Sequence, residues 1–199
     1  MNHQPDQPTQ GGEDHPHPEH EPRLHPRIYV ASLSDYNAGQ LHGTWLDATA
    51  DVDELTAGIN DMLARSLELG AEEWAIHDYE GWGPLHLSEY ESIDTITRVA
   101  GGIATHGPAF AHWAEVAGTD TEDLDGFDDA YLGHWDSTEA YAEDLLDDMG
   151  YPDLVERAIP EYLQPYVRLD TEGFARDLEL SGDVTSSEGD DGVYLFART

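Results

Sequence analysis

The sequence predicts an α+β fold, arranged as an elongated chain of three small modules behind a disordered leader. Strand-length runs of β-branched and aromatic residues alternate with segments whose apolar residues recur at helical spacing. A stretch without strand alternation separates two such mixed regions, and 39% hydrophobic residues in 199 suffice to build cores. The expected parts are a leader (1–27), an N-terminal α+β module (28–86), a helical middle module (87–127) and a C-terminal α+β module (128–199).

The leader is rich in Pro, His and acidic residues and has no aromatic residue. It cannot bury enough apolar surface to offset the entropy of ordering, so we expect disorder. The run HPHPEH, His15 to His20, has residue types that bind divalent metals. Proline-separated histidines in a flexible segment hold no fixed geometry, so no metal site is expected.

The first module opens with a strand at Ile28 (IYVASL), followed by the loop signal SDYNAGQ and a second strand over Leu41 to Asp47. An amphipathic helix follows from Val52, with Asp51 or Asp53 as its N-cap. A third strand, Glu73 to Tyr79, ends at the turn 81–84.

In the middle module, apolar residues from Ile93 to Ile103 follow helical spacing before GGIATHGP interrupts them. An acidic linker, TDTEDLDGFDD, leads to the last module. There we expect, in order, the strand Ala130 to Trp135, the helix Ser137 to Met149, short helical pieces within 157–180, and a hairpin pairing 183–187 with 193–198.

The charge is extreme: 43 acidic residues face 8 basic ones, all Arg, for a net charge of −35. Such a chain repels nucleic acid and anionic membranes, so basic protein surfaces are its natural partners. Cys is absent, which excludes disulfides and thiolate chemistry. No secretory signal and no run approaching about 18 apolar residues is present, so we expect a cytoplasmic protein without membrane contact.

Residues 99–156 contain no Lys or Arg. On a helical wheel, the helix Ser137 to Met149 has one apolar half and one acidic half. Like charges one turn apart destabilise a helix by about 0.2 to 0.5 kcal/mol per pair, yet this helix has several such acidic pairs. A protein surface that binds phosphates could bind this row of carboxylates. The candidate partner-binding acids are Asp120, Glu122, Asp123, Asp125, Asp128, Asp129, Glu139, Glu143, Asp144, Asp147 and Asp148.

Other candidate sites favour structural roles. His77, Asp78 and Glu80 have acid-base residue types, but strand alternation separates them onto two faces. Gly101 and Gly102 lack the Lys and Ser/Thr of a phosphate loop. The sequence therefore predicts neither catalytic residues nor a cofactor. Four tryptophans in apolar settings are expected in the core: Trp45, Trp74, Trp113 and Trp135.

Several segments resemble the ArdA family of antirestriction proteins. They are IYVASLSDYNAGQLHGTWLDA (28–48), EEWAIHDYEGW (72–82), LSEYES (87–92), YLGHWDS (131–137) and FARDLEL (174–180). The resemblance implies an elongated α+β protein, dimeric through its C-terminal region, that imitates DNA in the groove of type I restriction-modification enzymes. The resemblance also implies that such a protein blocks restriction and often modification. The family's antirestriction motif corresponds to AIPEYLQPYVRLD (158–170), with Pro160, Glu161, Tyr166 and Asp170 as matches.

Three functions therefore stay open on the sequence. The first is a non-enzymatic DNA mimic directed at type I restriction-modification enzymes. The second is an acidic module that sequesters another basic DNA-binding protein. The third is a halophilic metal-dependent hydrolase, since acidity also keeps a protein hydrated in a salt-rich cytoplasm and His77 and Asp78 could serve it.

Overall fold

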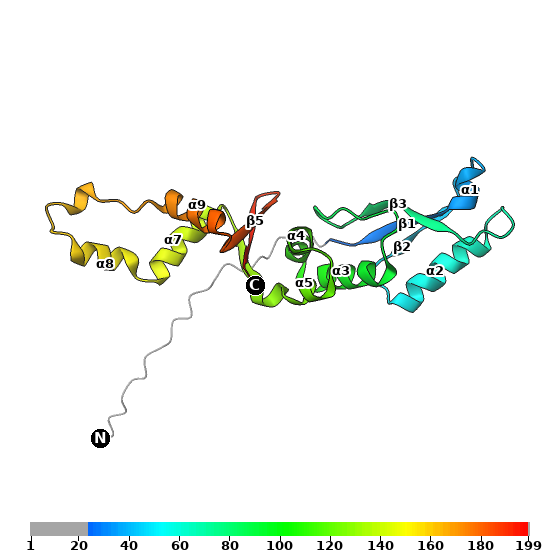
Figure 1. Cartoon of the computed structure of the whole chain (residues 1–199), viewed down its shortest axis with the longest axis horizontal. Helices are drawn as coiled ribbons and strands as arrows, with labels where there is room; N and C mark the ends of the chain where they lie inside the picture. Colours follow the sequence, from blue (N-terminus) through cyan, green and yellow to red (C-terminus); the bar gives the residue numbers. More distant parts are fainter. Residues whose placement is uncertain (1–23, 199) are drawn as a thin grey trace, which may run out of the picture.

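A computed structural model describes residues 24–198, and its mixed helices and strands confirm the α+β class. The molecule is elongated, and its two small sheets lie at different places along the long axis (Figure 1). The run from His15 to His20, where the sequence predicts no metal site, lies outside the described residues. Leu24 packs against the core and Arg27 begins the first strand, one residue before the predicted start at Ile28.

The N-terminal sheet is antiparallel, with β1 (Arg27–Ser32) between β2 (Gly43–Asp47) and β3 (Trp74–Glu80). Its strands confirm the three predicted ones. Helix α2 (Val52–Ala64) packs on the sheet through Leu55, Ile59 and Met62, which are buried. Of the two predicted caps, Asp51 is the one used, because its carboxylate accepts a hydrogen bond from the Glu54 amide at 2.8 Å.

A short helix, α1 (Leu33–Asn37), occupies part of the segment predicted as a loop. Ser32 caps it by accepting a hydrogen bond from the Asp35 amide. The Asp35 side chain is fully buried and accepts from Ser66 Oγ at 2.5 Å and from the Leu67 amide at 3.2 Å. Hydrogen bonding by the side chain of Ser32, and then by that of Ser66, holds the pKa of Asp35 below its usual value. The carboxylate therefore ties α1 to the end of α2.

The middle of the chain holds α3 (Ile93–His106) and α4 (Pro108–Ala117), which meet at Gly107. The prediction that the glycine pair would end the first helix is wrong, because α3 continues through Gly101 and Gly102. Packing explains the exception. A Cβ built on Gly102 would lie 2.1 Å from the Phe110 ring, so this glycine lets α4 approach α3 closely.

The two glycines give a matched stability test. Gly101→Ala is expected to stabilise the protein by about 0.5 to 1 kcal/mol, because alanine favours the helix and a Cβ there meets no atom within 4 Å. Gly102→Ala should instead destabilise by about 1 to 3 kcal/mol, since Phe110 must move. Urea unfolding of both variants measures the difference, and equal effects would contradict the packing explanation.

The acidic stretch predicted as a linker is helical. It forms α5 (Thr121–Asp125) and α6 (Phe127–Ala130). Leu124 and Phe127 are buried, and the Phe127 ring lies 5.2 Å from that of Phe110. Trp113 Nε1 also donates to the Asp123 carbonyl at 2.9 Å. Apolar residues spaced between the acids therefore fix this segment against α4.

The C-terminal sheet is antiparallel in the order β4 (Tyr131–Trp135), β6 (Gly192–Ala197) and β5 (Val184–Gly189). It confirms the predicted strand and terminal hairpin. Helix α4 packs on one face, where the Trp113 and Phe196 rings lie 5.2 Å apart. Other helices follow β4 in the chain: α7 (Thr138–Asp148), α8 (Tyr151–Ala158), a 3-10 turn (Gln164–Tyr166) and α9 (Thr171–Ser181).

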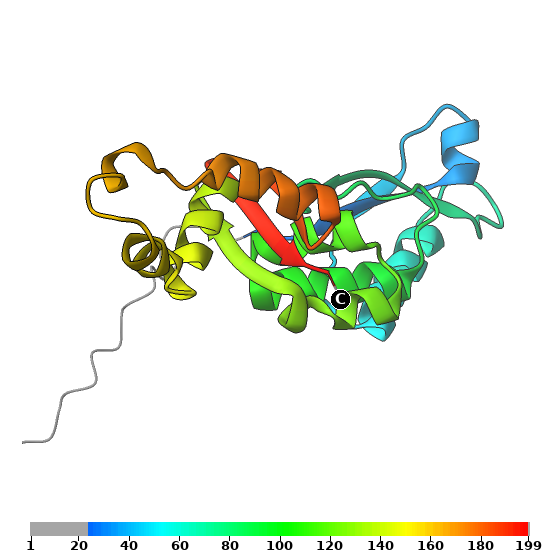
Figure 2. The same ribbon diagram turned by 60° about the vertical axis from the view of Figure 1, so that its left-hand side comes forward.

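Helix α9 lies along the terminal hairpin, as the turned view shows (Figure 2). Its Glu179 carboxylate accepts hydrogen bonds from Ser186 Oγ of β5 and Thr138 Oγ1 of α7, both at 2.9 Å. One contiguous cluster of buried residues joins Ile28, Ile96 and Phe196, which come from the three expected modules. The boundaries between those modules stay a prediction.

His112 of α4 is buried where this helix meets the C-terminal sheet. Its ring stacks on Tyr194 at 4.1 Å, and its Nδ1 lies 2.8 Å from Ser187 Oγ. Burial, and then the charge of His134, lower the pKa of His112 to about 4, while Asp190 acts in the opposite direction. The junction therefore holds a neutral histidine at pH 7.

This histidine makes stability depend on pH. An unfolded histidine titrates near pH ~6.5, so the unfolded chain binds the proton first as pH falls. Stability is expected to drop between about pH 6.5 and pH 4, by on the order of 2 kcal/mol. The His112→Gln variant should not show this loss of stability at low pH. Urea unfolding of both proteins from pH 7 to pH 4 tests it, and parallel curves would exclude the assignment.

Candidate partner-binding surface

Helix α7 carries the predicted acidic row on a well-anchored support. Ser137 caps its N-terminus by accepting a hydrogen bond from the Ala140 amide at 3.1 Å. On its inner face, Ala142 and Leu146 are buried. Tyr141 packs edge-on against Trp135 of β4, with ring centroids 5.4 Å apart. Burial, and then the charge of Asp144, raise the pKa of Tyr141.

The acidic half of α7 faces solvent. Carboxylates one helical turn apart are spaced by about 5 to 6 Å along the axis, so the helix presents a regular anionic row. Glu139 also accepts a hydrogen bond from Thr171 Oγ1 of α9 at 3.2 Å. The exposed acids of this helix are Glu139, Glu143, Asp144, Asp147 and Asp148.

A second acidic group lies on α5 and α6 and at their ends. Asp128 lies 3.9 Å from His106 Nδ1, and the Asp123 backbone receives the Trp113 hydrogen bond. The side chains in this group are all exposed: Asp120, Glu122, Asp123, Asp125, Asp128 and Asp129. Their helices lie near the middle of the molecule, and α7 lies further along the long axis (Figure 1).

Little of this charge is neutralised internally. Within residues 24–198, arginine pairs with a carboxylate at two places: Arg27 with Glu80 at 2.9 Å, and Arg157 with Asp153 at 3.3 Å. The second pair joins two exposed side chains one turn apart on α8, where such pairs stabilise by only a few tenths of a kcal/mol. Neither pair involves α5, α6 or α7.

The four motif-like residues lie apart from α7, on the segment after α8. Pro160, Glu161 and Tyr166 are exposed. Asp170 has a structural role as well, because it caps α9 by accepting a hydrogen bond from the Gly173 amide at 2.9 Å. The structure therefore groups the α7 acids but does not bring the motif residues onto the same helix.

An exposed apolar region surrounds this segment. Helix α8 buries no residue, although it is strongly amphipathic. A hollow of about 270 Å³ lies between α8 and the following segment, lined partly by Val155, Ile159 and Val167. Large hydrophobic side chains around it face solvent: Met149, Tyr151, Leu154, Tyr162, Leu163, Tyr166 and Val167.

The residues considered for other chemistry have ordinary roles. His77 is exposed and contacts Tyr36 edge-on at 4.8 Å, while Asp78 accepts a hydrogen bond from the Tyr79 amide. No group of three metal-ligating side chains occurs among the described residues. Of the four predicted core tryptophans, Trp113 is buried; Trp45, Trp74 and Trp135 are half-buried.

Sequence reasoning missed two features near α1. The Ser32 to Asp35 spacing is a capping-box signal that would have predicted this helix. A concavity beside it unites residues far apart in the chain, for which the sequence has no signal. Within the described part of the chain, no helix has the length and apolar character needed to cross a membrane.

Comparison with known proteins identifies the family. Residues 28–191 match the family model described as "Antirestriction protein (ArdA)". No curated protein sequence matches the chain. The match spans most of the described residues, including every candidate acid, the N-terminal sheet from Ile28 onward and strands β4 and β5; strand β6 follows the matched residues. The chain therefore belongs to the ArdA family, whose members are antirestriction proteins that counteract type I restriction-modification enzymes.

Proposed function

We propose that this protein acts as a DNA mimic, occupying the DNA-binding groove of a type I restriction-modification enzyme and blocking restriction, and modification as well. The observation that carries the proposal is the exposure of every candidate acid on α5, α6 and α7 without a paired arginine on these helices. A groove that binds phosphates offers Lys and Arg side chains to such a row. The inhibitor needs no catalytic residue and no cofactor.

Charge and shape agree with this proposal. Duplex DNA carries one charge per ~1.7 Å, so a net charge of −35 equals that of roughly 60 Å of duplex. The molecule is elongated and its acidic helices follow one another along the long axis (Figure 1). Because no base is read, target range should follow the shape of the groove. Inhibition should be stoichiometric and should weaken as salt rises.

The C-terminal module is proposed as the dimer interface. The support is the exposed apolar region around α8, because large apolar side chains on an unpartnered surface mark interaction sites. A dimer would double the length of the anionic surface. Pro160, Glu161 and Tyr166 lie in this region, so the motif-like segment would act through the interface or beside it.

A restriction-protection assay tests the function in cells. Cells carrying a defined type I system receive unmodified phage DNA with and without this protein expressed. We expect protection of the DNA, and loss of host modification over several generations if methylation is blocked too. Restriction unchanged against several type I systems would overturn the proposal. A pull-down that captures a different basic DNA-binding protein would then favour sequestration.

A further inference from the structure

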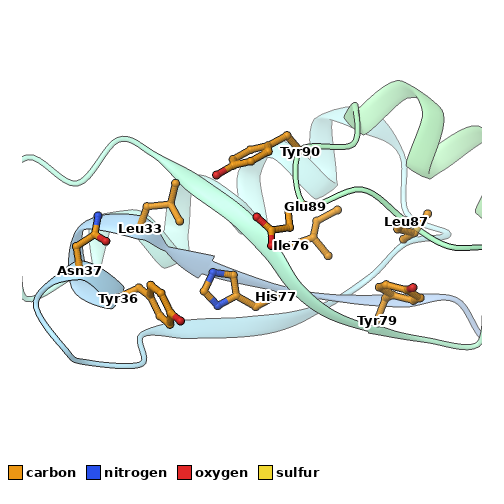
Figure 3. Close-up of a pocket in the computed structure, with 9 residues that line it drawn as sticks. All are labelled: Leu33, Tyr36, Asn37, Ile76, His77, Tyr79, Leu87, Glu89 and Tyr90. Atoms are coloured by element: carbon orange, nitrogen blue, oxygen red, sulfur yellow. The ribbon is translucent and has the colours of Figure 1, made fainter.

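A concavity of about 540 Å³ lies between α1, β3 and the segment 87–90 (Figure 3). Tyr36 enters it from α1, His77 from β3, and Glu89 and Tyr90 from the segment. The segment is held in place because the Ile76 amide donates to the Glu89 carbonyl at 2.9 Å. The acidic surface described above does not include these residues.

The walls are aromatic and accessible. Tyr36 is 57% exposed and Tyr90 68% exposed. Tyr36 meets the His77 ring edge-on, with centroids 4.8 Å apart and an interplanar angle of 85°. Figure 3 shows Tyr36 beside His77, with Glu89 and Tyr90 on the other side of the histidine. Both tyrosine side chains are therefore accessible to a ligand that enters the concavity.

The concavity also has one acidic side chain in its lining. Glu89 is exposed and lies among the lining residues, and none of the lining residues is an arginine. Aromatic faces attract cations through their quadrupole. Among cations, a planar guanidinium can stack on a ring while its fork of donors binds a carboxylate. This combination suits an arginine side chain better than a lysine.

One wall of the concavity is positioned before any ligand binds. Tyr36 follows Asp35, whose buried carboxylate accepts hydrogen bonds from Ser66 and Leu67. The Leu33 amide also donates to the Glu73 carbonyl at 3.0 Å, next to the start of β3. Fixing α1 in this way lowers the entropy lost when a ligand orders its site.

We propose that this concavity receives an arginine side chain of the protein partner, with the guanidinium stacked on the tyrosines and paired with Glu89. The identity of the partner rests on the proposed function, whereas guanidinium binding by the site does not. This would be one specific contact on the N-terminal module, in addition to the electrostatic attraction that is spread over many acidic residues.

Guanidinium binding is tested on the full chain by NMR titration with N-acetyl-arginine methylamide. The citrulline analogue is the neutral isostere, and the lysine analogue carries the same charge. We expect saturable shifts of the Tyr36, His77 and Tyr90 ring signals with the arginine compound, about 5-fold weaker binding of the lysine compound and no saturation with citrulline. Equal binding of all three would overturn the proposal.

Variants then test the partner. Glu89→Gln is compared with Glu115→Gln, an exposed residue of α4 that carries the same charge change away from the concavity. Glu89→Gln should lower the affinity for the arginine compound and for a type I methyltransferase by about 5- to 10-fold. Glu115→Gln should lower both affinities by less than about 2-fold. Equal effects on the methyltransferase would reject the partner's arginine as occupant. If wild type forms no complex, the proposed function fails instead, while the titration still judges the site.

Discussion

Reversing Glu143, Asp144, Asp147 and Asp148 together to lysine is expected to weaken the complex with a type I methyltransferase by about 100- to 1,000-fold at low salt. All four side chains are exposed on α7 and lack an arginine partner within the described residues. Each reversal turns an attraction of at most about 1 kcal/mol into a repulsion. Isothermal titration or fluorescence anisotropy at several salt concentrations measures the loss and its shallower salt dependence.

The fold should survive this change. Ala142 and Leu146, which anchor α7, are untouched. The pairs 143/147 and 144/148 stay like-charged, and only the pair 139/143 changes from repulsive to attractive, by roughly a few tenths of a kcal/mol. Thermal unfolding should therefore shift little. The single variant Asp147→Lys is the matched control and should weaken binding by less than about 10-fold. Wild-type affinity in the quadruple variant would remove α7 from the binding surface.

Placing glutamate at both Leu154 and Leu163 is expected to convert a dimer to monomer, raising the dimer dissociation constant by about 100-fold or more. Both side chains are exposed in the apolar region around α8, at 56% and 40%. Burying each in an interface would contribute about 1 to 2 kcal/mol, and an unpaired buried carboxylate would cost more. Analytical ultracentrifugation over a concentration series measures the equilibrium.

The matched control replaces Leu67 and Leu69, which are exposed at 73% and 104% on the N-terminal module. This double glutamate variant has the same charge change and should leave the oligomeric state unchanged. A dimer that survives the C-terminal variant, or dissociates equally in the control, would reject the C-terminal module as the interface. The monomer should remain folded, because α8 buries no residue of its own.

Local pattern was enough to predict most of the fold. The strand beginning near Ile28, the helix capped by Asp51 and the terminal hairpin all have their apolar residues at the period that their structure requires. The solvent-facing acidic half of α7 followed from the same spacing, since its apolar half includes the buried Ala142 and Leu146. The spacing of apolar residues shows which face of a helix or strand is buried. The sequence could therefore predict these elements and the exposed face of α7.

Contacts between distant residues decided the remaining features. Gly102 reads as a helix breaker unless Phe110 is known to lie against it. The segment 119–129 reads as a charged linker because its buried residues, Leu124 and Phe127, are few and widely spaced among acids. The concavity lined by Tyr36, His77 and Glu89 depends on how α1 and the segment 87–90 meet β3. No spacing along the chain encodes such a meeting.

Competition for the groove tests the central claim most directly. A type I methyltransferase is saturated with a fluorescent duplex containing its target site, and this protein is titrated against it at low salt while anisotropy and complex mass are followed. The DNA-mimic account predicts stoichiometric release of the duplex and a complex of enzyme and inhibitor without DNA. A ternary complex that retains the duplex, or no release at any concentration, would contradict it.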